Sequence, residues 1–335
     1  MFEGRAVLVT GADGFIGSHL AERLVREGAC VRALVFYNAF DSRGWLDSSP
    51  PDVRGALDVV MGDIRDVDQV RRAMDGCEIV FHLAALVGIP HSYLAPRSYV
   101  ETNVVGSLNV LEAARQCGVA RVVHTSTSEV YGTARYVPID EEHPLAAQSP
   151  YAASKIGADQ LALAYRRSFG LPVSIIRPFN TYGPRQSLRA VIPAIITQLA
   201  SGRRQVRLGN LSPTRDFSFV EDVVSGFLAV AAADGSLGQV TNIGTDFEVS
   251  IRRLAELIAE VMGCPIEFGL DEQRVRPPGS EVERLRASHE KARRVLGWQP
   301  EVSGEAGLRR GLQVTAEWYS RQENLARYHD RDYAV

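Results

Sequence analysis

Tyr151 and Lys155 lie four residues apart, and their side-chain types and spacing suit acid–base chemistry. On a helix, positions four apart lie one turn apart on the same face. A free phenol has a pKa near ~10 and is a poor base, but a neighbouring ammonium and the positive ring of an oxidised nicotinamide dinucleotide both lower that pKa. We therefore expect Tyr151 to take a proton from a sugar or alcohol hydroxyl while a hydride leaves the same carbon. Such pairs also occur by chance on amphipathic helices, so this interpretation depends on the rest of the chain.

A glycine-rich turn near the start of the chain predicts a site for the dinucleotide. An apolar run at residues 5–10 predicts a strand, and the pattern over about residues 15–27 predicts a helix. Glycines between a strand and a helix let the backbone approach a pyrophosphate, which the helix N-terminus then holds. The spacing is Gly-x-x-Gly-x-x-Gly; a plain strand–helix turn is the alternative. The predicted cofactor contacts of this turn are Gly11, Asp13, Gly14, Phe15, Ile16 and Gly17.

Strands and helices then alternate along the chain, which predicts a doubly wound parallel sheet that binds ligands beyond the carboxyl ends of its strands. We expect further strands at 31–37, 57–61, 79–83, 119–125 and 173–177, and helices at 99–114 and 150–169. A short strand near residue 242 and a helix at 251–262 follow. Further predicted cofactor contacts, beside Tyr151 and Lys155, are Asn38, Asp63, Ile64, Leu83, Ala84, Ala85, Asn103, Thr125 and Arg177. For Asp63, a cap of the next helix is the alternative to a contact with adenine.

The end of the second predicted strand bears on the choice between NAD and NADP. Many NAD-binding folds place an acidic residue there, on the ribose 2′-hydroxyl. Residues 35–38 contain neither an acid nor a basic pair, and Arg43 lies further along. NAD is therefore favoured, with NADP left open.

The regular alternation ends after residue 178, where prolines and a glycine interrupt the pattern. We predict a Rossmann-type dinucleotide-binding domain at 1–178 with about 217–245. A smaller α+β substrate-binding domain is predicted at 179–216 and 246–320, followed by a C-terminal tail at 321–335.

Composition excludes several other classes of function. The chain has 335 residues and a net charge of −3 without a sustained basic run, which argues against nucleic-acid binding. No apolar run approaches ~20 residues, so no membrane span is expected. The first strand begins within a few residues of the N-terminus, which leaves no room for a signal peptide. The four cysteines (Cys30, Cys77, Cys117 and Cys264) have no metal-binding spacing, so we expect no metal site and a reduced, cytoplasmic protein.

These motifs together resemble the extended short-chain dehydrogenase/reductase family over about residues 4–316. They occur in the family's order: the three glycines, Asp63-Ile64, residues 82–85, Asn103, Thr127, Tyr151 with Lys155, and residues 177–180. The resemblance implies a tightly bound, recycled NAD and a homodimer formed through helices near 99–115 and 151–168. It also implies a nucleotide-diphosphate sugar as substrate, with Arg215 and Arg276 on its phosphates as charge-assisted donors. The predicted substrate contacts are Ser92, Asn180, Arg185, Arg215 and Arg276.

The residues after Thr127 narrow the reaction within the family. Ser128 and Glu129 make this segment similar to nucleotide-sugar 4,6-dehydratases and to UDP-glucuronate decarboxylases, whereas simple 4-epimerases lack an acid there. The resemblance implies that Tyr151 and Thr127 act on O4, that Lys155 lowers the phenol pKa and holds the ribose, and that Glu129 removes the C5 proton. The dTDP-glucose dehydratases have Asp where this chain has Ser128, so either Ser128 or Glu129 could supply the proton to the leaving hydroxyl. For Glu129, a carboxylate that only stabilises a helix start is the alternative.

A 4,6-dehydratase acting on an NDP-hexose is the favoured function. Residues 31–38, 43–46 and 276–285 resemble dehydratases of nucleotide-activated N-acetylglucosamine, so UDP- or GDP-N-acetylglucosamine is the expected substrate, and the GDP-mannose type is the related expectation. A decarboxylase would need a cation for the C6 carboxylate, for which Arg185 or Arg274 is available. A 4-epimerase and a non-catalytic dinucleotide-sensing protein are the remaining alternatives.

Overall fold

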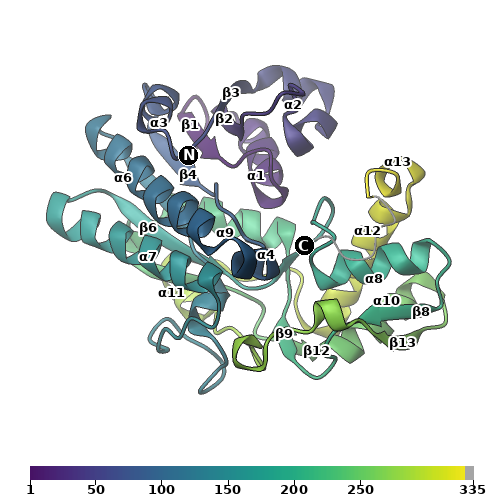
Figure 1. Ribbon diagram of the computed structural model, residues 1–335. Helices are drawn as coiled ribbons and strands as arrows, with labels where there is room; N and C mark the ends of the chain where they lie inside the picture. The colour runs from purple at the N-terminus through teal and green to yellow at the C-terminus, as the bar shows by residue number, and fades with distance from the viewer. Residues whose placement is uncertain (329–335) are drawn as a thin grey trace.

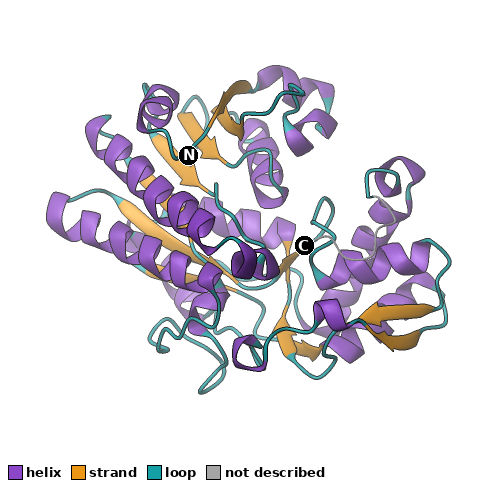
Figure 2. Ribbon diagram, viewed as in Figure 1, coloured by secondary structure: helices purple, strands orange, loops and turns teal. Residues whose placement is uncertain are grey.

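A seven-stranded parallel sheet forms the centre of the protein, whose computed structural model describes residues 1–328 (Figures 1 and 2). The strand order is β11-β6-β5-β4-β1-β2-β3, and every neighbouring pair is parallel. The order reverses at β1, which pairs with both β2 and β4, and this is where a doubly wound sheet opens a ligand crevice. The strands are β1 Ala6–Thr10, β2 Cys30–Phe36, β3 Asp58–Gly62, β4 Ile79–His82, β5 Arg121–Thr125, β6 Val173–Pro178 and β11 Val240–Ile243.

Helices cover both faces of this sheet because its strands are apolar on both sides. Val7 and Val9 of β1 join a core with one set of helices, whereas Leu8 between them joins a second core on the opposite face. The first face carries α1 Phe15–Arg26 and α9 Val220–Ala232; the second carries α3 Val67–Met74, α6 Gly106–Gln116 and α7 Pro150–Phe169. The prediction of a Rossmann-type doubly wound sheet is confirmed.

Helix α7, which carries Tyr151 and Lys155, is closed at both ends by its own sequence. The Ser149 side chain accepts a hydrogen bond from the Ala152 amide, and Pro150 occupies the first helical position. At the other end Gly170 adopts a left-handed conformation with φ of 70°. These local signals made the bounds of this helix readable from the sequence.

The helix predicted at 99–114 differs from the expectation. Its start is α5 Pro96–Tyr99, and residues Val100–Val105 form a π-helical segment before α6 begins. The segment contains Asn103, which is fully buried. A π-helical turn inside an α-helix frequently marks a functional position, and nothing in the apolar periodicity distinguishes it from α-helix.

The rest of the chain packs beside the carboxyl ends of the strands (Figure 1). Helices α8 Val191–Ala200, α10 Ile251–Met262 and α12 Gly304–Ser320 pack on one another. Three two-stranded sheets accompany them: β7 Thr181–Tyr182 with β10 Ser218–Phe219, β8 Gln205–Leu208 with β13 Glu267–Leu270, and β9 Thr214–Asp216 with β12 Glu248–Ser250. The smaller helices are α2 Pro51–Ala56, α4 Ile89–Leu94, α11 Glu290–Leu296 and α13 Gln322–Leu325.

The C-terminal tail predicted at 321–335 contains one of these short helices. Helix α13 lies within it, and Tyr328 packs its ring beside Trp318 and Tyr319 of α12. The remainder, 329–335, lies outside the described residues. Within residues 1–328 no helix is both long and apolar enough to cross a membrane.

Candidate active site

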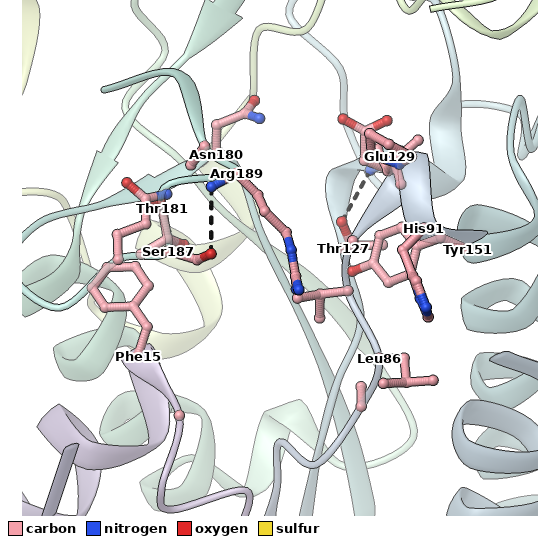
Figure 3. A pocket seen from close by; sticks show the side chains of 18 of the residues that line it. Phe15, Leu86, His91, Thr127, Glu129, Tyr151, Asn180, Thr181, Ser187 and Arg189 are labelled. Atoms are coloured by element: carbon pink, nitrogen blue, oxygen red, sulfur yellow. Dashed lines mark hydrogen bonds between the residues drawn. The ribbon is translucent and has the colours of Figure 1, made fainter. Parts of the chain in front are cut away.

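A cavity of about 1020 Å³ lies beyond the carboxyl ends of the central strands. Residues of the glycine turn and of the ends of β2, β3, β4 and β5 line it on the sheet side, and parts of the segments 178–192, 208–217 and 273–281 line it on the other. In Figure 3, Thr127, Glu129 and Tyr151 lie opposite Asn180, Thr181 and Ser187 across this space. One hollow therefore joins the predicted cofactor and substrate residues.

The glycine turn has the geometry that a bound pyrophosphate needs. A Cβ on Gly11 would lie 2.8 Å from Ala84 Cα, and a Cβ on Gly17 only 2.1 Å from the Gly11 carbonyl oxygen, so neither position admits a side chain. No side chain caps the N-terminus of α1 at Gly14. The first amides of this 12-residue helix are therefore free to bind an anion, and these residues fit a dinucleotide.

Two acidic residues flank the cofactor end of the cavity. Burial raises the pKa of Asp13, whose carboxylate accepts a hydrogen bond from the Phe36 amide. Hydrogen bonds from Arg65 lower the pKa of Asp63. Asp63 is not the cap of α3, because Asp66 accepts hydrogen bonds from the Asp68 and Gln69 amides there.

Tyr151 and Lys155 both line the cavity and are both buried, and this changes the expected electrostatics. Burial raises the pKa of Tyr151, with hydrogen bonding to Thr127 acting to lower it and the charge of Glu129 acting to raise it. Burial also lowers the pKa of Lys155 to about 8. In the chain alone, desolvation, which disfavours the phenolate, is the largest influence on the Tyr151 pKa, and a lowering of that pKa by Lys155 stays a prediction.

Thr127 caps the 3-10 helix Ser128–Tyr131, which follows β5 and begins with Ser128 and Glu129. The Thr127 hydroxyl accepts a hydrogen bond from the Glu129 amide at 3.2 Å, so this threonine both caps the turn and faces Tyr151 (Figure 3). The Glu129 carboxylate is only 10% exposed, and its Oε2 lies 3.9 Å from Arg276 Nη1. A carboxylate thus stands next to the Tyr151 phenol.

Two arginines and a second glutamate form a charged group on the substrate side. Arg215 Nη2 lies 3.4 Å from Glu281 Oε1, and Arg276 Nη1 lies 3.9 Å from the same oxygen. Arg276 Nη1 and Asn180 Oδ1 are buried without a hydrogen-bond partner among the described residues. Buried polar atoms rarely stay unpaired, so a polar ligand group is the natural partner for both.

Five of the predicted site residues do not line the cavity: Asn38, Ser92, Asn103, Arg177 and Arg185. Asn103 instead lies behind the cavity wall and hydrogen-bonds a residue that forms it. Its amide nitrogen donates to the Leu86 carbonyl and to Ser154 Oγ, and its oxygen accepts from the Leu86 amide. Asn103 therefore fixes the loop after β4 against α7, close to Tyr151.

The side chains of the other four residues form ion pairs or hydrogen bonds within the protein. Arg185 pairs with Glu22 at 2.7 Å and Arg177 with Asp159 at 2.9 Å, and both pairs are largely buried. Ser92 Oγ donates to a backbone carbonyl within α4, and the Asn38 side chain closes its own loop. The geometry does not support a direct ligand contact for Arg177 and Arg185, because a buried ion pair is costly to break. The Ser92 and Asn38 side chains lie outside the cavity wall and are already hydrogen-bonded.

Several residues of the cavity wall had no sequence signal. His91, Ser187, Arg189 and Glu281 line it together with predicted residues. In Figure 3 the Arg189 side chain extends from the substrate wall toward Thr127. His91 lies in the short helix α4, and the other three come from irregular segments, where periodicity carries no information about the direction of a side chain.

Comparison with known proteins agrees with this geometry. The family model for GDP-mannose 4,6-dehydratase matches residues 8–311. The chain belongs to this family of extended short-chain dehydrogenases/reductases. It is 38% identical to a UDP-glucose 4-epimerase of Mycolicibacterium smegmatis (93% of this chain, 97% of the relative) and 37% identical to a dTDP-glucose 4,6-dehydratase of Streptomyces griseus (95% of each).

A solved structure shows the same relationship over nearly the whole chain. The dTDP-glucose 4,6-dehydratase DesIV of Streptomyces venezuelae, solved with NAD bound, is 32% identical with a TM-score of 0.85, covering 97% of this chain and 99% of that one. Family members similar to this chain therefore include both dehydratases and epimerases, and the residues around Tyr151 must discriminate between the two reactions.

Proposed function

We propose that this protein is an NAD-dependent nucleotide-sugar 4,6-dehydratase. The observation that carries the proposal is the position of Glu129, a buried carboxylate on the cavity wall beside Thr127 and Tyr151. Hydride transfer at C4 needs only the tyrosine, the lysine and the cofactor. Removing the C5 proton needs a further base, and Glu129 is the carboxylate in reach of that carbon when O4 lies at Tyr151.

The cofactor is NAD, which when bound accepts the hydride from C4 and later returns it to C6. The glycine turn and the open N-terminus of α1 fit its pyrophosphate. The β2 end, residues Phe36 and Tyr37, offers no cation for the extra phosphate of NADP. Because the hydride returns to the same sugar, no external reductant is needed and the dinucleotide should stay bound.

Different side chains of the protein carry out the proton transfers. Tyr151 takes the O4 proton in its phenolate form, which the positive nicotinamide ring and the Lys155 ammonium favour over the neutral phenol of the chain alone. The Thr127 hydroxyl, which faces Tyr151, hydrogen-bonds the same O4 oxygen. With C4 oxidised, the C5 proton becomes acidic and Glu129 removes it. Glu129, directly or through Ser128, returns a proton to the departing C6 hydroxyl, which leaves as water. C5 takes up a proton as the hydride is returned to C6, and Tyr151 releases the O4 proton, so both side chains return to their starting states. Arg215 and Arg276 hold the diphosphate end of the substrate.

A second candidate function is decarboxylation of a nucleotide-activated glucuronate. It requires a cation for the C6 carboxylate, and the geometry favours a different residue from the two considered in the sequence. Arg185 is paired with Glu22 outside the cavity, and Arg274 lines the cavity but is paired with Asp271. Arg189 lines the cavity and extends toward Thr127 (Figure 3), so it is the cation placed to hold a C6 carboxylate.

Mass spectrometry after incubation with a panel of nucleotide sugars, without added reductant, tests the proposal. Loss of one water from a UDP- or GDP-activated N-acetylglucosamine, or from a GDP-mannose, supports the dehydratase and identifies its substrate. Loss of carbon dioxide from a glucuronate supports the decarboxylase. An unchanged mass with inverted C4 stereochemistry supports an epimerase, and an untouched panel with retained dinucleotide supports a sensing protein.

Two further sequence predictions remain part of the proposal. The first is the division into a dinucleotide-binding and a substrate-binding domain at the residues given above. The second is a homodimer formed through α6 and α7. Exposed apolar side chains on the adjoining helical segment, Val100 and Val105, favour such an interface, and the molecular mass in solution tests it.

A further inference from the structure

A cluster of buried ionisable side chains lies beneath the catalytic lysine, and the proposed reaction does not use it directly. Asp159 follows Lys155 by one turn on α7 and is fully buried. His124 of β5 and Arg177 of β6 face it from the sheet. Because a buried charge without a partner is costly, the groups in this cluster must compensate one another.

The hydrogen bonds of Asp159 keep its carboxylate ionised. Its Oδ2 accepts from Ser126 Oγ at 2.7 Å and from Arg177 Nη2 at 2.9 Å, and its Oδ1 lies 3.3 Å from His124 Nε2. Burial acts to raise the pKa of Asp159, but the adjacent His124 imidazole, the charge of Arg177 and the hydrogen bond from Ser126 together outweigh it, so the pKa is lowered.

On the sheet side of Lys155 the remaining groups supply no further negative charge, and Glu129, on the cavity side beside Tyr151, has Arg276 as its own cation at 3.9 Å. Burial lowers the pKa of His124 and of His82 on β4, which leaves both imidazoles neutral near pH 7. Tyr131 in the 3-10 helix, whose hydroxyl accepts from Arg177 Nη1, has its pKa raised by burial to about 12. Tyr151 on α7 itself is likewise a neutral phenol. Asp159 is therefore the anion that balances two buried cations, Lys155 and Arg177.

We propose that Asp159 is a positioning residue of the reaction: its buried carboxylate holds Lys155 in the ammonium form on the floor of the cavity. This inference rests on the oxidation step that Tyr151 and Lys155 perform in the proposed function. Without Asp159, Lys155 and Arg177 would be two buried cations without a counter-charge. The guanidinium keeps its proton under such conditions, whereas a buried ammonium loses it readily.

The test is the pH dependence of kcat in the Asp159→Asn protein, which has the same side-chain shape without the charge. The alkaline limb of the profile should move to lower pH by about one unit or more, which is a ~tenfold loss of kcat at a fixed pH above the limb. KM should change little, because Asp159 does not line the cavity. The matched control is His124→Gln, which disturbs the same cluster but replaces one neutral group by another and should leave the limb in place.

A second variant, expected to move the alkaline limb in the opposite direction, keeps the proposal testable if Asp159→Asn does not fold. Arg177→Met removes the competing cation, so the alkaline limb should move to higher pH. An unmoved limb in either folded variant overturns the proposal, and so does an equal shift in His124→Gln, which would indicate a packing effect. Failure of the proposed function looks different, because the wild-type protein would then form no dehydrated product at any pH.

Discussion

Replacing Glu129 by glutamine separates oxidation at C4 from loss of water. The change keeps the size of the side chain and removes the base. Loss of a general base typically costs ~10²–10⁴-fold in rate, equivalent to about 3–5 kcal/mol of activation free energy. The partner charge is Arg276 Nη1, 3.9 Å from Glu129 Oε2. Arg276 stays in place and loses only the neighbouring charge of Glu129, so it can still hold the substrate phosphate. We therefore expect KM to stay level or fall while kcat for dehydration drops.

The assay follows two signals in one sample. Reduced nicotinamide should accumulate, visible in its near-ultraviolet absorbance, because C4 is oxidised and the hydride cannot be returned. Mass spectrometry should show little dehydrated product over the same period. Glu281→Gln is the matched control, since Glu281 Oε1 also lies 3.9 Å from Arg276 Nη1 but belongs to the phosphate side. That variant should change KM without trapping reduced cofactor.

The reasoning fails if Glu129→Gln forms dehydrated product at the wild-type rate, because C5 deprotonation would then depend on another group. It also fails if the variant forms no reduced nicotinamide at all, since Glu129 would then be needed for the first step. If reduced cofactor accumulates in both variants, the trapping does not depend on the position of Glu129, and the assignment of Glu129 as the C5 base fails.

Four further outcomes are expected. Tyr151→Phe should abolish turnover, measured by product formation, while the dinucleotide content of the purified protein stays near that of the wild type; retained activity would contradict the role of the phenol. Because the pKa of Lys155 is lowered to about 8 and its charged form is needed, kcat should fall as pH rises through that region, and a rate that keeps rising above it would contradict this assignment. Gly17→Ala places a Cβ 2.1 Å from a backbone oxygen of the glycine turn, so the variant should lose bound dinucleotide at least ~tenfold more readily on gel filtration, with the change checked by absorbance. Arg276→Gln should raise KM about tenfold or more through loss of a charge-assisted phosphate contact, whereas Arg185→Gln should leave KM unchanged and lower the unfolding temperature because Glu22 loses its buried partner.

Much of the fold could be predicted because its signals are short-range. Ser149, Pro150 and Gly170 specify the ends of α7 within one turn of each end. The alternation of apolar strands with helices leaves a parallel sheet as the arrangement that buries both. The π-helical segment around Asn103 escaped prediction, because one extra backbone position in a turn leaves the side-chain pattern of a helix almost unchanged.

The site was predictable where a residue type and a local motif coincide. The glycine turn, Thr127, Glu129, Tyr151 and Lys155 all line the cavity. Arginines were harder to place, because a long charged side chain reaches in many directions from its backbone position. Arg185 forms an ion pair with Glu22, whereas Arg189, four residues later, lines the cavity.

The sequence by itself determined the chemistry that this protein carries: a nucleotide-binding turn and a tyrosine–lysine pair on one helix face, each encoded within a few neighbouring residues. Only the tertiary structure decided which distant groups surround that pair. Burial, rather than the ammonium of Lys155, dominates the pKa of Tyr151, and Asp159, Arg177 and His124 meet beneath the lysine from three separate elements. Desolvation and charge pairing depend on what packs around a group in space, and that information is spread over the whole chain rather than held in any one motif.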